Sequence, residues 1–359
     1  MKKVKFSAAV FFLLASAITI MAMPEKVEKK LHHDFDVNDA SVLIIKNKFG
    51  KVDVQNWENK SVSIDVVITV DYASREKAEK LLSYLDVEFS TEGNQLKAIT
   101  RIDDRFNKIG NSGWRNNGKE FNIDYTVKMP KTLNIDLLNK YGDVFVDELA
   151  GESRIAVKYG NLKINKLSRG NAKPLATVVL AYSNGIIDGA NWIKLEMKYS
   201  KMEITKAKAL LMNSAYSKLY LDEVSSLVAD SKYDTYKVGR AENFVVDGAY
   251  SNYKFDYIGK KLNIDTRYTG TTVEKVSADF QKITIDNAYG GVKLGIDRAA
   301  SYTLKAYVKY AHISYPDNAR VNRISENNAT SIDGIVGTNS APKAQVKIES
   351  RYGSINLIY

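Results

Sequence analysis

The stretch MNSAYSKLYLDEV, from Met212 to Val224, decides the fold because close copies of it lie on both sides. EMKYSKMEITKA begins at Glu196, and DSKYDTYKVGRA begins at Asp230. Each copy has a tyrosine near its middle, and successive tyrosines are 18, 23, 17, 17, 17, 17, 18, 21, 21 and 42 residues apart. A repeat near 17 residues predicts similar units that stack and share one core. The repeating tyrosines are Tyr141, Tyr159, Tyr182, Tyr199, Tyr216, Tyr233, Tyr250, Tyr268, Tyr289, Tyr310 and Tyr352.

Apolar residues within one unit alternate in the way that strands require. With Tyr216 as position zero, the other apolar positions of its unit are Leu210, Met212, Leu219, Leu221 and Val224. The period of two predicts a strand before the tyrosine and another after it, and a small or polar pair between them predicts a turn. We therefore expect an all-β fold, a single-stranded-repeat β-solenoid similar to a β-helix. Rungs of about 17 residues would make a rod roughly 60 Å long.

The tyrosines are expected to form an internal column with one ring on each rung, at the strand spacing of about 4.8 Å. Burying each ring removes roughly 150–250 Å² from water, which makes this structural core column a large part of the predicted core. Small residues two positions earlier, such as Ser214 and Gly248, would leave room beside the ring. An exposed aromatic platform for sugars stays open as the alternative.

The N-terminus has the features of an export signal. Three lysines precede an apolar run, and small residues offer cleavage after Ala17 or Ala22. We expect a signal peptide at residues 1–22, although the run is also long enough for an uncleaved membrane anchor. An exported protein in the periplasm or on the cell surface follows from this expectation.

Most of residues 23–130 do not follow the 17-residue repeat. The segment from Leu43 to Trp57 obeys the repeat template with Phe49 at zero, so one orphan rung is expected before the main array. A helix over residues 74–85 with Ser74 as its N-cap, and strands over 62–72, 87–90, 96–102 and 121–129, predict a small α+β cap. The β-solenoid repeat domain is expected to cover residues 131–359. Two loops rich in Asn, Gly and Ser are expected at residues 103–119 and 316–342.

Several segments carry a likeness to a known family: NKFGKVDVQNW at Asn47, EKAEKLLSYLDVEF at Glu76, DYTVKMPKTLNIDLLNKYGDV at Asp124, VKYGNLKINKL at Val157 and KIESRYGSINLIY at Lys347. The chain resembles a bacterial family of exported β-strand-repeat proteins that bears the name "putative adhesin". The resemblance covers nearly the whole chain after the signal segment and implies the repeat fold. It brings no catalytic or binding residues, because the family has none established.

Composition narrows the classes of function. The formal net charge is +10 and cysteine is absent, which excludes disulfides, thiolate metal sites and a cysteine nucleophile. An exported basic protein meets anionic glycans, lipids or cell walls before it meets nucleic acid. We expect an anionic glycan or an envelope protein as the partner, and no nucleic acid.

Charged residues follow the repeat as well. From Lys158 to Lys309 the residue before the tyrosine alternates between a cation and alanine, and carboxylates lie two positions earlier. The expected ion pairs are Glu196 with Lys198, Asp230 with Lys232, Asp265 with Arg267 and Glu349 with Arg351. The pattern fits either charge management on a solvated sheet or a periodic strip for an anionic polymer. The candidate interaction surface is Lys158, Lys198, Lys232, Arg267 and Lys309, with Trp114 and Arg115 from the first loop.

Catalytic and metal chemistry have little support in the sequence. Asp230, Asp247, Asp265 and Asp286 would lie on successive rungs near the separation of a retaining glycosidase pair, but a uniform row does not push two pKa values apart. Residues 32–39, HHDFDVND, begin like a calcium loop, but Asp39 stands where glycine is needed. With three histidines and none of the common hydrolase or nucleotide motifs, we expect no enzyme, no cofactor and no metal site.

The sequence therefore predicts a non-enzymatic, exported cell-envelope or surface protein, an adhesin-like β-solenoid that presents charged sheets to a glycan or protein partner. Two alternatives stay open. One is a structural envelope protein that assembles end to end through its last rung, which Ile355 to Tyr359 would form. The other is a β-helix enzyme that acts on polysaccharide.

Overall fold

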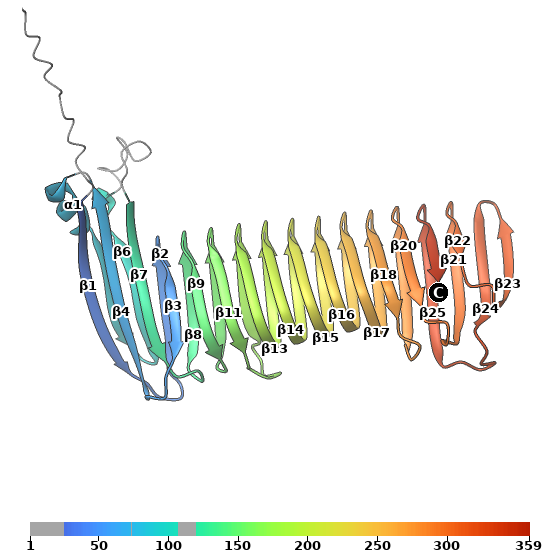
Figure 1. The fold of residues 1–359 in the computed structure, drawn as a ribbon, viewed down its shortest axis with the longest axis horizontal. Coiled ribbons are helices and arrows are strands. Elements are labelled where there is room, and N and C mark those ends of the chain that lie inside the picture. Colours follow the sequence, from blue (N-terminus) through green and yellow to red (C-terminus); the bar gives the residue numbers. More distant parts are fainter. Residues whose placement is uncertain (1–24, 73, 107–119) are drawn as a thin grey trace, which may run out of the picture.

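The computed structural model describes residues 25–72, 74–106 and 120–359. Its strands form one open hydrogen-bonded sheet that runs along the molecule (Figure 1), and the predicted all-β class is confirmed. One end of the row contains β1 (Glu25–Asp36), β4 (Ser61–Tyr72), α1 (Arg75–Leu82), β5 (Leu85–Glu92), β6 (Gln95–Ile102) and β7 (Glu120–Met129). Next come β2 (Val42–Lys48), β3 (Val52–Asn56), β8 (Asn134–Lys140), β9 (Val144–Leu149), β10 (Ser153–Lys158), β11 (Asn161–Leu167) and β12 (Ala176–Ala181).

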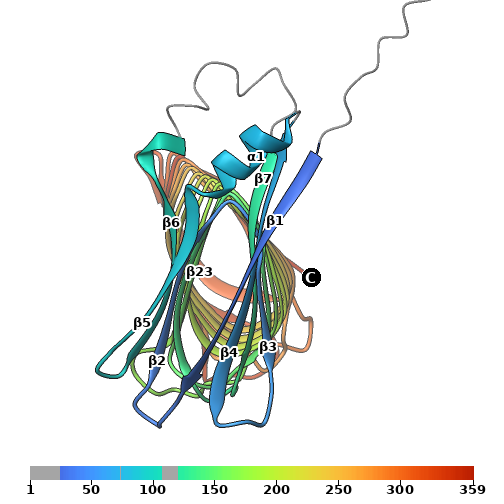
Figure 2. The same ribbon diagram turned by 90° about the vertical axis from the view of Figure 1, so that its left-hand side faces the viewer.

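Long strands occupy the middle of the row: β13 (Asn184–Lys198), β14 (Lys201–Ala215), β15 (Lys218–Lys232), β16 (Thr235–Ala249) and β17 (Asn252–Arg267). The other end contains β18 (Gly270–Val276), β19 (Lys282–Ala288), β20 (Val292–Ile296), β21 (Tyr302–Lys309), β22 (Ile313–Ser314), β23 (Ala319–Glu326), β24 (Ala329–Val336), β25 (Ala344–Arg351) and β26 (Ile355–Ile358). Seen along the row, successive strands overlie one another and bend around one interior (Figure 2).

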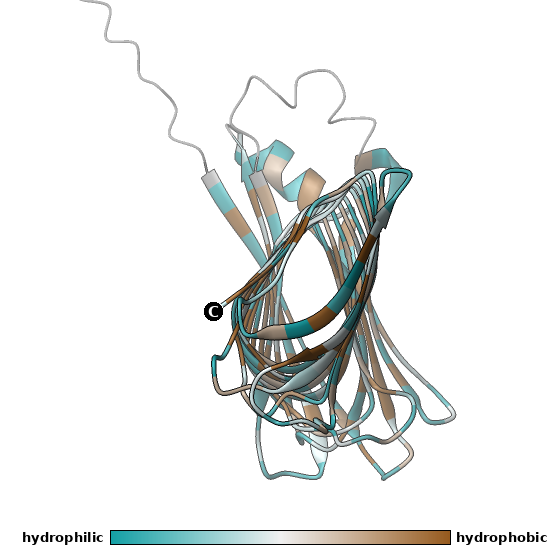
Figure 3. Cartoon of the chain, turned by 90° about the vertical axis from the view of Figure 1, so that its right-hand side faces the viewer, coloured by the Kyte–Doolittle hydropathy of each residue, from teal (hydrophilic) through white to brown (hydrophobic). Residues whose placement is uncertain are grey.

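The middle strands pair in parallel with an offset of one repeat. Lys201 lies beside Lys218, and Leu219 lies beside Tyr236. Buried and exposed side chains alternate along much of β14 and β15, and Leu210, Met212, Leu219, Leu221 and Val224 are buried as predicted. Figure 3 shows apolar and polar residues interspersed along the strands. Between β16 and β17 the register shifts near Asn243, which accommodates the one extra residue in the gap of 18 between Tyr250 and Tyr268.

The repeating tyrosines are not core residues, and that prediction was wrong. All eleven lie between 43% and 52% exposed. Each has a φ between 51° and 59°, in the left-handed region, and Phe49 has a φ of 63°. A strand keeps its alternation only while its residues remain extended. The left-handed residue shifts the phase at position zero, so the next residue turns inward, as buried Ser217 does after Tyr216.

The tyrosines instead stack on one another along an exposed corner of the molecule. Neighbouring ring centroids are 4.7–5.0 Å apart, and the ring planes differ by 2–13°. We call this stack the ring ladder; in spatial order it is Phe49, Tyr141, Tyr159, Tyr182, Tyr199, Tyr216, Tyr233, Tyr250, Tyr268, Tyr289, Tyr352 and Tyr310. The stacking covers the ring faces, whereas ring edges remain accessible. The predicted column therefore exists, but outside the core.

A second ladder, of hydroxyl groups, satisfies the backbone at this corner. Ser217 Oγ donates to the carbonyl of Ala215 at 2.8 Å and accepts the N–H of Ser200, one rung earlier, at 3.2 Å. Ser183, Ser251 and Thr269 make the same kind of bond to the carbonyl two residues before them. These bonds support the turn at the ladder tyrosines that a serine or threonine follows, from Tyr182 to Tyr268 except Tyr233.

Replacing a ladder tyrosine tests this backbone conformation. Tyr233→Ala removes two stacked contacts at about 0.5–1.5 kcal/mol each and keeps a residue with Cβ at positive φ. Tyr233→Gly removes the same contacts but accepts positive φ without the Cβ penalty. We expect chemical denaturation to show the Gly variant more stable than the Ala variant by about 0.5–1 kcal/mol. An Ala variant as stable as the Gly variant would contradict the left-handed turn.

Small residues two positions before the tyrosine make room for a different ring from the one predicted. A Cβ built on Gly248 would lie 2.1 Å from the hydroxyl of Tyr253. Tyr236 and Tyr253, three residues after the ladder tyrosines, are fully buried and pack with their centroids 5.0 Å apart. Ser231 and Gly248 thus accommodate these core tyrosines.

The order of strands at the C-terminal end differs from the order of the sequence. β25 pairs in parallel with both β19 and β21, so Tyr352 stacks between Tyr289 and Tyr310. β26 likewise pairs with β20 and β22, so the prediction that Ile355 to Tyr359 form the last rung was wrong. Residues 316–342, predicted as a loop, contain β23 and β24. These strands form an antiparallel hairpin with Asn327 and Asn328 at positive φ, and β24 pairs antiparallel with β21.

The N-terminal elements agree with the prediction more closely. β1, β4 and β7 pair antiparallel, and α1 buries Ala78 and Leu81, while Ser74 makes no side-chain cap hydrogen bond. β2 and β3, on either side of Phe49, pair in parallel with β8 and β9. The Phe49 unit therefore stacks directly on the Tyr141 unit and is not isolated in space. Residues 1–22, predicted as a signal peptide, lie outside the described residues.

Candidate interaction surface

A row of cations lies beside the ring ladder, on the residue that precedes each ring. The strand register places these residues next to one another on successive rungs. The cation row, in spatial order and with its alanines, is Lys48, Lys140, Lys158, Ala181, Lys198, Ala215, Lys232, Ala249, Arg267, Ala288, Arg351 and Lys309. It contains the predicted residues Lys158, Lys198, Lys232, Arg267 and Lys309. The structure thus brings these five together in one line.

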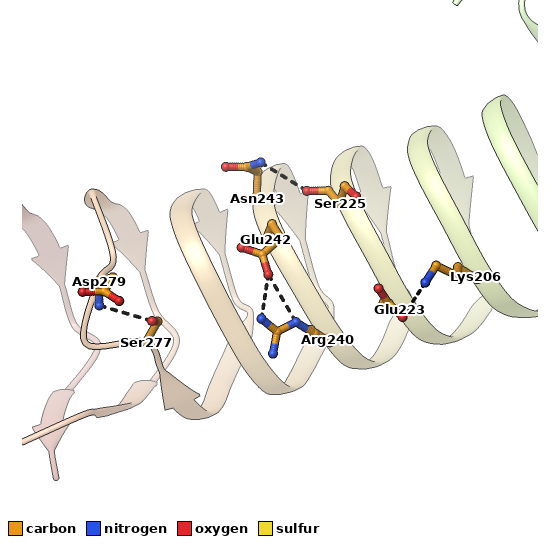
Figure 4. A network of polar contacts seen from close by, with 8 residues as sticks. All are labelled: Lys206, Glu223, Ser225, Arg240, Glu242, Asn243, Ser277 and Asp279. Atoms are coloured by element: carbon orange, nitrogen blue, oxygen red, sulfur yellow. Dashed lines mark hydrogen bonds and ion pairs between the residues drawn. The ribbon is translucent and has the colours of Figure 1, made fainter. Parts of the chain in front are cut away.

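None of the eight cations in the row forms an ion pair with a described side chain within 4.0 Å. Lys48, Lys198 and Lys309 instead place their Nζ atoms 4.9, 5.8 and 5.4 Å from the centroids of the rings that follow them. The opposite corner of the repeat behaves differently (Figure 4). There Lys206 pairs with Glu223 at 3.1 Å and Arg240 pairs with Glu242 at 2.8 Å. The cations beside the ring ladder are therefore available to an external anion.

The four predicted ion pairs do not form. Glu196 pairs with Lys194 at 2.6 Å, not with Lys198, and Glu349 pairs with Lys347 at 3.1 Å, not with Arg351. Residues two positions away in either direction along a strand lie on the same face, so the earlier lysine competes equally with the later cation. Asp230 and Asp265 form no ion pair with Lys232 and Arg267 within 4.0 Å.

Five carboxylates form a second line on the same face, two residues before the cation row. This acid row is Asp230, Asp247, Asp265, Asp286 and Glu349, and it occupies successive rungs without gaps. Partial burial, together with the charges of Asp286 and Asp247, raises the pKa of the Asp265 carboxyl, and Arg267 opposes this shift. The acid row lies farther from the ring ladder than the cation row does. The cation row therefore lies between the ring ladder and the acid row.

Hollows lie where alanine interrupts the cation row. One of about 470 Å³ lies around Ala288, between Arg267 and Arg351, and Tyr268, Tyr289 and Tyr352 also line it. Another of about 640 Å³ is lined by Ala181, Lys198 and Ala215. The first hollow therefore lies between two cations with an alanine at its centre, whereas the second lies around Lys198 with an alanine on each side.

Three cations of the row were missing from the predicted surface, and two predicted residues cannot be placed. Lys48 and Lys140 precede Phe49 and Tyr141 just as Lys158 precedes Tyr159, so the repeat template alone could have identified them. Arg351 enters the row because β25 pairs with β19. Trp114 and Arg115 lie outside the described residues.

One buried carboxyl interrupts the hydroxyl ladder. Asp234 stands where Ser217 and Ser251 stand on the neighbouring rungs, and it is 3% exposed. It accepts the Ser217 N–H at 2.7 Å and the hydroxyls of Ser214 and Ser231 at 2.6 and 2.8 Å. Burial raises the pKa of Asp234, and these hydrogen bonds oppose the rise. Because the Asp234 carboxyl is buried, a substrate in solution could not contact it, and we assign it to the core.

The raised pKa of Asp234 gives a pH dependence with a definite sign. The folded state holds the proton to higher pH than the unfolded state does, so the free energy of unfolding falls as the pH rises from the unfolded-state pKa through the folded-state pKa. Asp234→Asn cannot ionise at this site. We therefore expect the stability of the Asn variant relative to the native protein to increase with pH over this window. Denaturation curves from acid to neutral pH would show it, and a constant difference would contradict the assignment.

The segment at residues 32–39, for which no metal site was expected, makes a hydrogen-bonded surface cluster. His32 contacts Asp65 at 2.8 Å and Asp34 at 3.1 Å, and these hydrogen bonds raise the pKa of His32. In the described part of the chain, no group of three or more His, Cys, Asp or Glu side chains is arranged to hold a metal ion. Over the same residues, no helix has the length and apolarity to cross a membrane.

Comparison with known proteins finds distant structural similarity. A "putative adhesin" from Parabacteroides distasonis shares 12% identity over 76% of this chain and 93% of its own, with a TM-score of 0.36. A "putative adhesin" from Parabacteroides merdae shares 9% identity over 92% and 97%, with a TM-score of 0.35. The chain is similar to solved structures that bear this adhesin name.

A "putative lipid binding protein" from Parabacteroides distasonis is also similar, with 14% identity over 92% of this chain and 97% of its own and a TM-score of 0.30. No family model and no curated protein matches the chain. At these identities and TM-scores the likenesses carry no argument about what the chain binds.

Proposed function

We propose that this protein is an exported, non-enzymatic, adhesin-like β-solenoid whose ring-ladder corner binds an anionic glycan. Residues 131–359 would form the solenoid and residues 23–130 its N-terminal cap. The parallel pairing at an offset of one repeat supports the solenoid, and the antiparallel β1, β4 and β7 at one end support the cap. The signal-like N-terminus supports export.

The observation that carries the proposed binding is the absence of ion pairs along the cation row. Cations that served only to balance the charge of the sheet would form ion pairs with the carboxylates two residues away, as Lys194 and Lys347 do. Lys198 and Arg351, beside the same carboxylates, remain unpaired. Unpaired cations along an extended corner attract a polyanion and bind it by releasing its counterions. Accessible ring edges along the same line would add contacts to sugar hydroxyls.

Binding to a panel of polysaccharides tests this function. We expect the purified protein to bind hyaluronan or chondroitin sulfate at low salt, to bind more weakly as salt rises, and not to bind neutral dextran. Each contact between a cation of the row and an anionic group of the polymer releases counterions, and added salt makes this release less favourable. Equal binding to dextran, or binding that salt does not change, would contradict the proposal.

End-to-end assembly is a second candidate, supported by the free edge of β23. Among the described strands it pairs only with β24, and its Ile324 is 53% exposed. A second copy could add to that edge through backbone hydrogen bonds. Light scattering at increasing concentration would show growing mass, whereas a mass that stays monomeric would count against it.

A further inference from the structure

We propose that the cation row selects an acidic glycan that carries one anionic group on every second sugar. This proposal rests on the proposed function and adds a spacing rule to it. In spatial order, cations and alanines alternate without exception over nine successive rungs from Lys158 to Arg351. Two rungs separate successive cations by about 9.5 Å. An extended disaccharide has about that length.

The alternation is not explained by repulsion between like charges. Cations on adjacent rungs would repel at the strand spacing of about 4.8 Å, and alanines between them would relieve this. The acid row, however, places five carboxylates on five successive rungs of the same face with no spacers. This face therefore tolerates like charges at the shorter spacing, although their proximity contributes to the raised pKa of Asp265. The spacing of the cations needs another cause.

The shape of the corner matches a polymer with two kinds of sugar. Arg267 and Arg351 stand on either side of the hollow around Ala288, and Tyr268, Tyr289 and Tyr352 line it. Asp265 and Asp286 of the acid row line it as well, so only an uncharged sugar suits its centre. A neutral sugar in the hollow would place the acidic groups of the sugars on either side next to the two guanidinium groups. A planar guanidinium can bind a carboxylate or sulfate with two hydrogen bonds.

The two neighbouring lines of residues confine such a polymer to the corner. Rings of the ladder cover each other's faces, so a sugar cannot stack on them and meets their edges and hydroxyls instead. Beyond the cation row, the acid row repels an anionic chain from the centre of the face over the rungs of Asp230 to Glu349. The polymer would therefore run parallel to the ring ladder, with one sugar on each rung.

Two polymers of equal length separate this rule from general attraction. Hyaluronan carries one carboxylate on every second sugar, and polymannuronate carries one on every sugar. A cationic surface without a spacing rule prefers the polymer of higher charge density, because that polymer releases more counterions. We expect the native protein to bind hyaluronan at least about threefold more tightly than polymannuronate at the same salt concentration, against that trend.

A variant in which lysines replace the alanines of the cation row tests the spacing rule. Ala215→Lys, Ala249→Lys and Ala288→Lys together place a cation on every rung from Lys198 to Arg351, and the neighbouring rungs show that this position accepts a long side chain. We expect the ratio of the two affinities to shift about tenfold towards polymannuronate. Glutamine at the same three positions fills the hollows without adding charge, so it should weaken the binding of both polymers alike and leave their affinity ratio near the native value. Circular dichroism and thermal unfolding confirm that each variant is folded.

The outcomes distinguish this rule from the proposed function. A native preference for polymannuronate, or an affinity ratio that the lysine variant leaves unchanged, overturns the spacing rule while salt-sensitive binding of either polymer upholds the function. Binding of chondroitin sulfate without binding of hyaluronan or polymannuronate also overturns the rule alone. If no anionic polymer binds, both proposals fail.

Discussion

Reversing three cations of the cation row should weaken polyanion binding by at least about tenfold. The variant combines Lys198→Glu, Lys232→Glu and Arg267→Glu, which lie on alternate rungs at the centre of the row. Each change removes an attraction and introduces a repulsion next to the polymer. The slope of the logarithm of affinity against the logarithm of salt concentration should also become less steep, because three contacts that displace counterions are lost. Titrations with hyaluronan at several salt concentrations measure both quantities.

A matched reversal on the other face is the control for net charge. Lys218→Glu, Lys237→Glu and Lys293→Glu change the charge by the same amount at exposed positions that follow the ring residues. Long-range attraction would weaken equally in both variants, but only the first variant loses contacts of the cation row. We expect the control to keep most of the native affinity. Equal losses in the two variants would mean that net charge, and not the cation row, governs binding.

Phe244→Ala should lower the free energy of unfolding by about 3–5 kcal/mol, the usual cost of emptying a fully buried aromatic site. The Phe244 ring packs 4.5 Å from Phe255 and 5.9 Å from Tyr253, measured between centroids. Because β15, β16 and β17 share this part of the core, the cavity would affect all three rungs. Guanidinium denaturation would show the loss, and hydrogen exchange would be faster in these strands.

The neighbouring exposed residue provides the control for that substitution. Val245→Ala changes a side chain that is 36% exposed on the outer face of the same strand, and its effect should be within about 0.5 kcal/mol. Together the two variants test which side of β16 faces the core. A larger loss from Val245→Ala than from Phe244→Ala would reverse the assigned register.

The repeat and its core could be predicted because alternation and period are both visible in the sequence. Leu219 and Leu221 on the predicted strand are buried, and the helix that contains Ala78 and Leu81 forms where it was expected. The exposure of Tyr216 could not be predicted in the same way. Tyrosine is apolar enough for the core and polar enough for the surface, so hydrophobic alternation does not reveal where the phase shifts. The left-handed backbone decides that point.

Two further differences between prediction and structure concern which residues are neighbours in three dimensions. Tyr352 lies between Tyr289 and Tyr310 because the β23–β24 hairpin allows β25 to return beside β19. Glu196 selects Lys194 over Lys198 although both are two residues away. In both cases the sequence order does not reveal the partner, and the three-dimensional structure does. The cation row was foreseen as a periodic pattern, whereas its lack of ion pairs required the coordinates.

Footprinting of the ladder tyrosines with and without bound polymer tests the central claim most directly. Hydroxyl-radical labelling followed by mass spectrometry reads the exposure of each ring separately. We predict that the eleven ladder tyrosines are labelled in the free protein, whereas buried Tyr236 and Tyr253 are not. Saturating hyaluronan should then protect a continuous run of ladder tyrosines. Unlabelled ladder tyrosines in the free protein, or protection confined to Tyr220 and Tyr257 away from the ladder, would contradict the account.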